Sequence, residues 1–461
     1  MNNALAFVRP SLSAAQRPKV ASVGAKVNEA AAGARRRWRR ATWFGVATFL
    51  AWSPVTTVKK LLPAGSTTRG VVLTLIPLIG VLAVLRLPYA GRRKPIDLLV
   101  GLLALLVVWQ AISVERTAGT STLLHVIPAA ALLVLAGAAR RQVTGMSATD
   151  IRYAVTGVLP GLCTLLILGW IVQYAHLVPV QSTTASSLHL SFSVHGYRLQ
   201  GLASGPDPLG FLAALVTLIA FVAQPGKLSW FTRVVGLLTV LASDSRTSII
   251  VLGVGLFMLW VFGPGLSMSN RMKALLLLAI AGIGGWRIID VQRQVNTDVL
   301  SGRDLIWHDL IPYLHHLPIF GYGPELFPRL VPLVFGPYAL AGQILDPQNQ
   351  WLNDSLEFGY AAAAMLTLLL VLIPRHGSKT YRRMLLFPLL TMVIVECFSE
   401  VPLAVFSSID GAFPLFLLLM WAPLRGRRKV VEMAELTRSE PSAQRTLFSV
   451  FPRQPHRARL G

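Results

Sequence analysis

The sequence predicts an all-α polytopic membrane protein of about 12 transmembrane helices, with a large polar loop that contains short helices. Of its 461 residues 54% are hydrophobic and only 14% are charged, too few charges to cover a soluble protein of this length. Apolar runs of about 17–25 residues, long enough to cross ~30 Å of hydrocarbon, recur along the chain. We therefore predict one membrane domain rather than several soluble ones.

The predicted spans are the apolar runs between polar connections. They cover residues 41–58, 70–88, 96–114, 121–139, 153–175, 207–224, 230–243, 246–264, 272–289, 352–374, 384–400 and 402–422. The run at 230–243 is short for a span, so we expect a tilted or broken helix there. Prolines inside several spans are tolerated, because neighbouring helices satisfy the backbone groups that a proline frees.

The net charge of +23 comes from lysine and arginine in the tails and in short loops. With a cytoplasmic N-terminus, most of them lie on the cytoplasmic side, as the positive-inside rule requires. This placement predicts contact with anionic membrane lipids and argues against nucleic acid. The chain then divides into a basic cytoplasmic tail (1–40), a membrane domain (41–422) and a second basic cytoplasmic tail of disordered composition (423–461).

Two long loops, 176–206 and 290–351, fall on the outward side of this topology. A helical membrane bundle needs only short connections, so the longer loop is the first candidate for a functional site. Cys163 and Cys397 lie in apolar spans and indicate neither a disulfide nor a metal site. The histidines show no metal-ligand spacing either, and we expect no metal and no cofactor.

Three arginines near the outward ends of spans lie in distinctive local sequence: Arg198, Arg246 and Arg303. Burying an arginine at the membrane boundary is costly unless an anion meets it. The forked donors of a guanidinium suit phosphate, so several on one side would form a pyrophosphate cradle. The alternative is that each extends to lipid head groups or pairs with a carboxylate such as Asp244.

The long loop also contains the pattern of a helix start. Ser301 and Asp304 form a capping-box-like pair, and the helix that follows should bend or end near Pro312. Polar residues then enter the next spans, where an acidic side chain is a functional candidate and an amide can cap a helix: Asn349, Asp354, Glu357 and Glu396.

Together these segments resemble the O-antigen ligase and polymerase superfamily, the Wzy-type polymerases and lipid A-core ligases. The resemblance rests on residues 198–201 with 206–210, 245–247, 301–307 with 321–323, and 348–359. Each stretch alone is common in proteins, but their order and their placement around one long outward loop make the set specific. The resemblance covers roughly residues 190–375.

The resemblance implies an inverting, metal-independent glycosyl transfer on the periplasmic face of the bacterial inner membrane. The implied donor is an undecaprenyl-pyrophosphate-linked oligosaccharide, whose pyrophosphate the family's arginines hold. A flippase and a chain-length regulator are the partners implied for a polymerase of this kind.

Matched to the family, Arg198 and Arg246 are the best counterparts of its arginines. The predicted catalytic set is Arg198, Arg246, Arg303, Gln348 and Asn349. Polar and aromatic residues of the same segments are predicted to bind the substrate: Tyr197, Ser245, Trp307, His308, Tyr322, Glu325 and Asp346.

The chain departs from the family at two positions. Pro206-Asp207 stands where Pro-Asn is usual, and Gln348 stands where the ligases carry a histidine that is their favoured base. An amide does not titrate, so Gln348 cannot be a base. Three explanations remain open: that the arginines suffice electrostatically, that transferase activity is lost, or that another residue is the base, namely His308, His315, Glu325 or Asp346.

Because the missing histidine argues most against a ligase, we expect a polymerase of exopolysaccharide or O-antigen repeat units. The alternatives are an O-antigen ligase that transfers glycan to a lipid acceptor, and a transporter or flippase for a lipid-linked sugar or a small anion.

Overall fold

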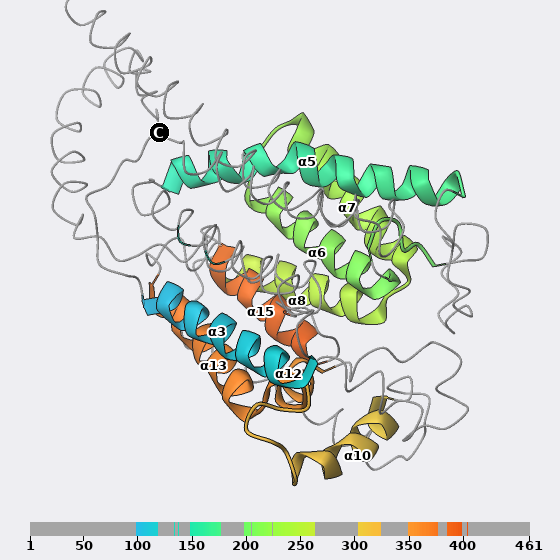
Figure 1. The fold of residues 1–461 in the computed structure, drawn as a ribbon. Coiled ribbons are helices and arrows are strands. Elements are labelled where there is room, and N and C mark those ends of the chain that lie inside the picture. The colour runs from blue at the N-terminus through green and yellow to red at the C-terminus, as the bar shows by residue number, and fades with distance from the viewer. Residues whose placement is uncertain are drawn as a thin grey trace, which may run out of the picture.

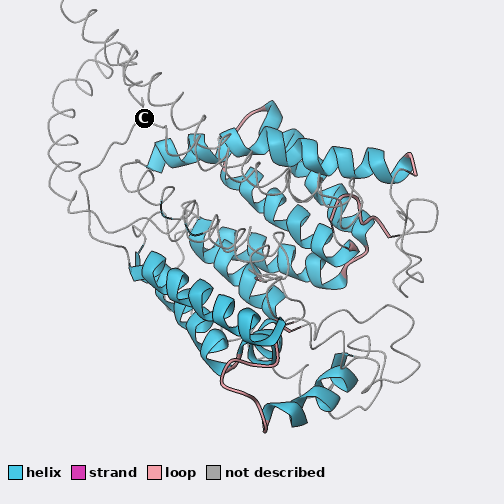
Figure 2. Ribbon diagram, viewed as in Figure 1, coloured by secondary structure: helices cyan, strands magenta, loops and turns pink. Residues whose placement is uncertain are grey.

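The computed structural model describes residues 98–118, 133, 137, 148–176, 198–203, 205–223, 225–262, 303–323, 349–376, 385–398 and 403. Within these ranges every regular element is a helix (Figure 2). The predicted spans 41–58, 70–88 and 272–289, both tails, and almost all of 121–139 and 402–422 lie outside the described residues.

The helices follow the predicted apolar runs. In chain order they are α3 (Leu98–Ala118), α5 (Ala148–Tyr174), α6 (Pro206–Val222), α7 (Lys227–Ser243), α8 (Arg246–Phe262), α10 (Arg303–Leu314), α12 (Gln350–Phe358), α13 (Tyr360–Leu372), the 3-10 turn η3 (Ile373–His376) and α15 (Phe387–Cys397). The run at 230–243 forms the continuous 17-residue helix α7, so no break occurs there.

Two of these helices are long and apolar enough to cross a membrane, over Leu98–Arg116 and Arg152–Tyr174. Four others, α6, α8, α13 and α15, are shorter apolar helices of 10–17 residues. Large apolar side chains are exposed along several of them, including Leu105 on α3, Ile171 on α5, Trp230 on α7 and Trp260 on α8. Apolar surface on this scale suits a hydrocarbon environment rather than water.

The helices pack in three layers (Figure 1). One outer layer holds α5 and α7, the middle layer holds α6, α8 and α15, and the other outer layer holds α3 and α13. A single hydrophobic core runs through all three. The middle helices therefore have neighbours on both sides, which makes them the most rigid support for residues at their ends.

The contact between α6 and α7 depends on small side chains. A Cβ atom on Gly236 of α7 would overlap the Thr217 hydroxyl of α6, so only glycine fits there. Thr217 donates its hydroxyl to the carbonyl oxygen of Ala213, 2.8 Å away, and so leaves no unsatisfied polar group in the core. Small residues let two helix backbones approach closely, which is the usual means of helix association in membranes.

The predicted span over 352–374 is helical but not one unbroken helix. The segment divides at Gly359, whose φ of +83° belongs to the left-handed region, into the short α12 and the apolar α13. The turn around Gly321 fills the break: Tyr322 N donates to Leu356 O at 2.8 Å and Gly323 N to Glu357 O at 2.9 Å. The backbone groups that the break frees are therefore satisfied by another segment of the chain.

The end of α3 closes the other side of this break. The Trp109 indole donates to Phe358 O at 2.8 Å, and the Ser113 hydroxyl donates to Phe320 O at 2.5 Å. The Trp109 and Phe320 rings also stack, with centroids 4.7 Å apart. The break between α12 and α13 is therefore a joint in which side chains of α3 donate to Phe358 O at the break and to Phe320 O in the turn that fills it.

The helix predicted after Ser301 is confirmed as α10, with Pro312 inside its last turn. It packs on α12 through a small apolar cluster centred on Leu310 and Leu356. Tyr322 anchors the end of α10, since its hydroxyl donates to the carbonyl oxygens of Tyr313 and His316. Partial burial raises the pKa of the Tyr322 phenol, so it remains a neutral donor.

Candidate functional site

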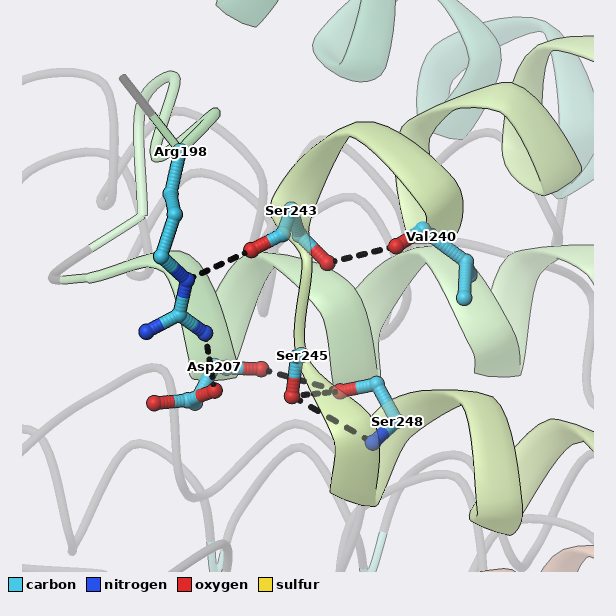
Figure 3. Close-up of polar contacts among 6 residues, drawn as sticks. All are labelled: Arg198, Asp207, Val240, Ser243, Ser245 and Ser248. Atoms are coloured by element: carbon cyan, nitrogen blue, oxygen red, sulfur yellow. Dashed lines mark hydrogen bonds and ion pairs between the residues drawn. The ribbon is translucent and has the colours of Figure 1, made fainter. Parts of the chain in front are cut away.

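Arg198 lies just before α6 and reaches across to the end of α7 (Figure 3). Its Nε donates to the carbonyl oxygen of Ser243 at 3.0 Å, and its Nη2 lies 2.7 Å from Oδ1 of Asp207. The side chains of Arg198 and Asp207 are 16% and 28% exposed. The guanidinium is thus held from two sides, at the edge of the bundle and in reach of solvent.

The backbone on either side of Arg198 is also fixed. Leu199 N donates to Ala242 O of α7 at 2.9 Å. From α5, the side-chain oxygen Oε1 of Gln173 accepts from Gln200 N at 2.8 Å and from Gly201 N at 3.0 Å. The loop therefore sits between α5 and α7, with its backbone groups satisfied by both.

Arg246 is the first residue of α8, and the residue before it caps that helix. The Ser245 hydroxyl accepts from Ser248 N at 3.3 Å and bonds the Ser248 hydroxyl at 2.9 Å, and Ile249 N donates to Ser245 O. The Ser248 hydroxyl also reaches Asp207 O at 3.4 Å, which joins the starts of α6 and α8. Ser245 is fully buried, so in this conformation it orders the start of α8 behind Arg246.

The start of α6 has few free donors. Pro206 and Pro208 carry no N–H, and Gly205 at the N-cap provides no side-chain bond. The carboxylate of Asp207 in the first turn complements the positive end of the helix dipole. Arg198 is therefore the main hydrogen-bond donor at this point, and Asp207 is its counter-charge.

Arg246 and Asn349 lie at the same end of the bundle. The end of α8 meets the start of α15, because the rings of Phe262 and Phe387 stack 5.6 Å apart. The two neighbouring helices are therefore antiparallel, and the start of α8 lies toward the end of α15 (Figure 1). Just past that end, Phe398 O accepts from the Asn349 side chain at 3.3 Å.

Asn349 itself caps α12, since its side-chain oxygen accepts from Leu352 N at 3.0 Å. Behind this cap, α12 buries polar residues at helical spacing on one face: Gln350, Asn353, Asp354 and Glu357. Asn353 donates to the Glu357 carboxylate at 3.1 Å, and Gln350 accepts from Leu403 N at 2.7 Å. The stripe lies inside the bundle, where such residues are costly and need partners.

The structure brings together only some of the residues predicted from the sequence. Arg198, Ser245 and the start of α8 with Arg246 form one group, and Trp307, Tyr322 and Asn349 belong to the α10–α12 region at the same end. Arg303 and His308 belong to α10, but their side chains lie outside the described part of the chain. Four further predicted residues lie outside it entirely: Tyr197, Glu325, Asp346 and Gln348.

Two residues of the group were missed in the sequence. Gln173 and Ser248 hold the Arg198 loop and the start of α8, and both are buried. The available signal for Gln173 was a glutamine inside an otherwise apolar span, where a polar side chain must find a partner. The sequence does not say which loop that partner comes from. Among the described residues, no group of three or more His, Cys, Asp or Glu side chains is arranged to hold a metal ion.

Residues 231–367 match the family model of the O-antigen ligases. The matched region begins in α7 and ends in α13, so it includes Arg246, α10, the turn at Gly321 and Asn349, while Arg198 and α6 precede it. No curated protein matches the chain. Over residues 231–367 the chain therefore matches the domain of the O-antigen ligase family, whose members are membrane enzymes of polysaccharide biosynthesis.

Proposed function

We propose that this protein is an inner-membrane glycosyltransferase that polymerises undecaprenyl-pyrophosphate-linked repeat units into exopolysaccharide or O-antigen on the periplasmic face. The observation that carries the proposal is the arrangement of Arg198 and Arg246 at the adjoining starts of α6 and α8. Both arginines lie at the helix ends that also face the α10–α12 region. Two arginines at these adjoining helix starts suit the two phosphates of a lipid pyrophosphate, because a guanidinium binds phosphate through forked hydrogen bonds.

The chemistry needs stabilisation of a leaving group. An acceptor hydroxyl attacks the anomeric carbon, the bond from that carbon to the pyrophosphate oxygen breaks, and negative charge grows on the lipid pyrophosphate. Arg198 uses Nε and one Nη2 proton in the contacts described above, which leaves further N–H donors for that charge. Donors already in place stabilise the transition state without reorganisation.

The proton of the acceptor hydroxyl needs a base, and Gln348 cannot serve. His308, His315, Glu325 and Asp346 remain the candidates. His315 is exposed just beyond α10, and Tyr322 holds that end of the helix. In this proposal the arginines and the base both contribute to the catalysis, and general base catalysis contributes typically 10²–10⁴-fold.

Replacing Asp207 by asparagine should strengthen donor binding. The Asp207 carboxylate competes with phosphate for Arg198, and asparagine retains an acceptor oxygen without the charge. The ion pair is partly exposed, so its loss is worth up to about 1 kcal/mol. We expect the KM for the lipid-linked donor to fall roughly two- to fivefold in Asp207→Asn, measured with the purified protein in vesicles.

Asp207→Ala is the companion variant, because it removes the contact as well as the charge. Its kcat should fall as Arg198 loses an orienting partner. A higher KM in Asp207→Asn would mean that the carboxylate helps to hold the donor, and would contradict competition.

A deletion strain tests the class of function. A polymerase predicts that lipid-linked single repeats accumulate on the periplasmic face and that long chains disappear. Accumulation on the cytoplasmic face would instead indicate a transporter or flippase. Free or lipid-carrier-linked long chains with only the lipid-A-attached form missing would indicate a ligase. A flippase and a chain-length regulator are the partners we propose for the polymerase.

A further inference from the structure

Gln173 occupies the last turn of α5 and is only 3% exposed. Its neighbours Ile171 and Tyr174 point outward and are 53% exposed each. A glutamine side chain has four hydrogen-bonding positions and is costly to bury in an apolar helix unless they are used. The partners of this side chain therefore indicate what it does.

Its partners are backbone groups of the Arg198 loop. The Gln173 amide donates to Arg198 O at 3.1 Å, while its carbonyl oxygen accepts from Gln200 N and Gly201 N. One side chain thus forms hydrogen bonds with the peptide groups on both sides of Leu199. Since Leu199 N also donates to Ala242 O of α7, the backbone of the loop is hydrogen-bonded to both helices.

The loop is also pressed against α5. Gly201 has a φ of +49°, and a Cβ atom there would come within 3.0 Å of the Cα atom of Gly169. Leu199 and Gln200 are only 0% and 3% exposed, so Arg198 is the most exposed of these three residues. Every contact that fixes this loop therefore also fixes the position from which the Arg198 side chain starts.

We propose that Gln173 is a positioning residue for Arg198, which it holds in place for the donor pyrophosphate by fixing the backbone of residues 198–201. This inference rests on the function proposed above. Gln173 does not touch the donor; it acts through Arg198. A misplacement of about 1 Å in a charge-stabilising group costs up to ~10²-fold in rate, so a loosened loop has a measurable effect on turnover.

The test is a double-mutant cycle between Gln173→Met and Arg198→Ala, with kcat and KM measured for the purified protein in vesicles with its lipid-linked donor. Methionine matches glutamine in length and removes all three bonds. We expect Gln173→Met to lower kcat/KM roughly tenfold in the normal protein, and to have an effect within about twofold when Arg198 is already alanine. Non-additivity of this kind shows that one residue acts through the other.

Two further variants keep the result interpretable. Thr239→Val is the matched control, since it removes the bond from the Trp170 indole at 3.0 Å, which joins α5 to α7 without involving residues 198–201. It should lower thermal stability about as much as Gln173→Met and leave kcat/KM unchanged. Gln173→Glu retains the acceptor for Gln200 N and Gly201 N and should recover part of the lost kcat/KM.

Each outcome has one meaning. If Arg198→Ala retains normal activity, the proposed pyrophosphate cradle is wrong and the inference falls with it. If Arg198→Ala retains only weak activity and Gln173→Met lowers kcat/KM by the same tenfold in both backgrounds, the cradle stands and Gln173 is only structural. The same conclusion holds if Thr239→Val lowers kcat/KM as much as Gln173→Met does.

Discussion

Removing either cradle arginine should abolish long polysaccharide chains. We expect Arg198→Ala and Arg246→Ala each to lower the rate of chain extension roughly 10²-fold or more, the cost of losing one preorganised donor to a developing negative charge. Arg198→Lys should recover little, because an ammonium cannot make two parallel bonds while holding Ser243 O and Asp207. The measurement is polysaccharide length on gels, with the amount of membrane protein determined in parallel.

The chain offers a matched control in Arg233 on α7. It is partly buried like Arg198 and Arg246, and like Arg246 it lies within the family-matched region. Its Nε donates to Ala220 O at 3.0 Å and its guanidinium lies over the Phe221 ring, at the opposite end of α6 from Asp207. Arg233→Ala should leave chain length normal. Normal chains in both Arg198→Ala and Arg246→Ala would rule out the cradle.

The largest loss of stability should come from a single methyl group at the α12–α13 break. In Gly359→Ala the Cβ atom would overlap the carbonyl oxygen of Ile319, and the φ of +83° would be strained for alanine. Strain of 1–3 kcal/mol and the displaced turn together cost about 3 kcal/mol or more. We expect the melting temperature in detergent to fall by roughly 5 °C or more, or the folded protein to be lost.

Gly321→Ala should behave in the same way, because its Cβ atom would meet the backbone of Glu357 across the same joint. Gly253→Ala on α8 is the control, since nothing lies within 4 Å of the position its Cβ atom would take. Alanine in a helix is favoured over glycine, so this variant should be as stable as the normal protein or slightly more so. Equal melting temperatures for all three variants would mean that the joint is not tightly packed.

The sequence predicted the apolar helices well where their length and composition are decisive. The segments at 153–175, 207–224 and 246–264 all form helices within a few residues of the expected ends. It failed at 352–374, because Gly359 inside a helical pattern also fits an unbroken helix. What breaks the helix is the turn at Gly321, which arrives from elsewhere in the chain and bonds the freed carbonyl groups of Leu356 and Glu357.

For the candidate site, too, the sequence predicted some features, and others follow only from the packing of the helices. Arg198 and Arg246 could be chosen from the sequence because a cation at the end of an apolar span needs an anion. The contact of Arg198 with Ser243 could not, because residues 45 positions apart meet only when α6 and α7 pack together, and the sequence did not distinguish Asp207 from Asp244 as the partner of an arginine. Gln173 was missed for the same reason, since its partners belong to a different part of the chain.

By itself, the sequence determined the membrane environment, the helical class and which arginines to propose for an anionic substrate, because these depend on composition and on local spacing. Only the tertiary structure decided which carboxylate neutralises Arg198, which side chain fixes its loop and where the span at Gly359 divides. These depend on which backbone donors and acceptors meet when the helices pack. Burial makes every such group need a partner, but the identity of that partner follows from the packing alone.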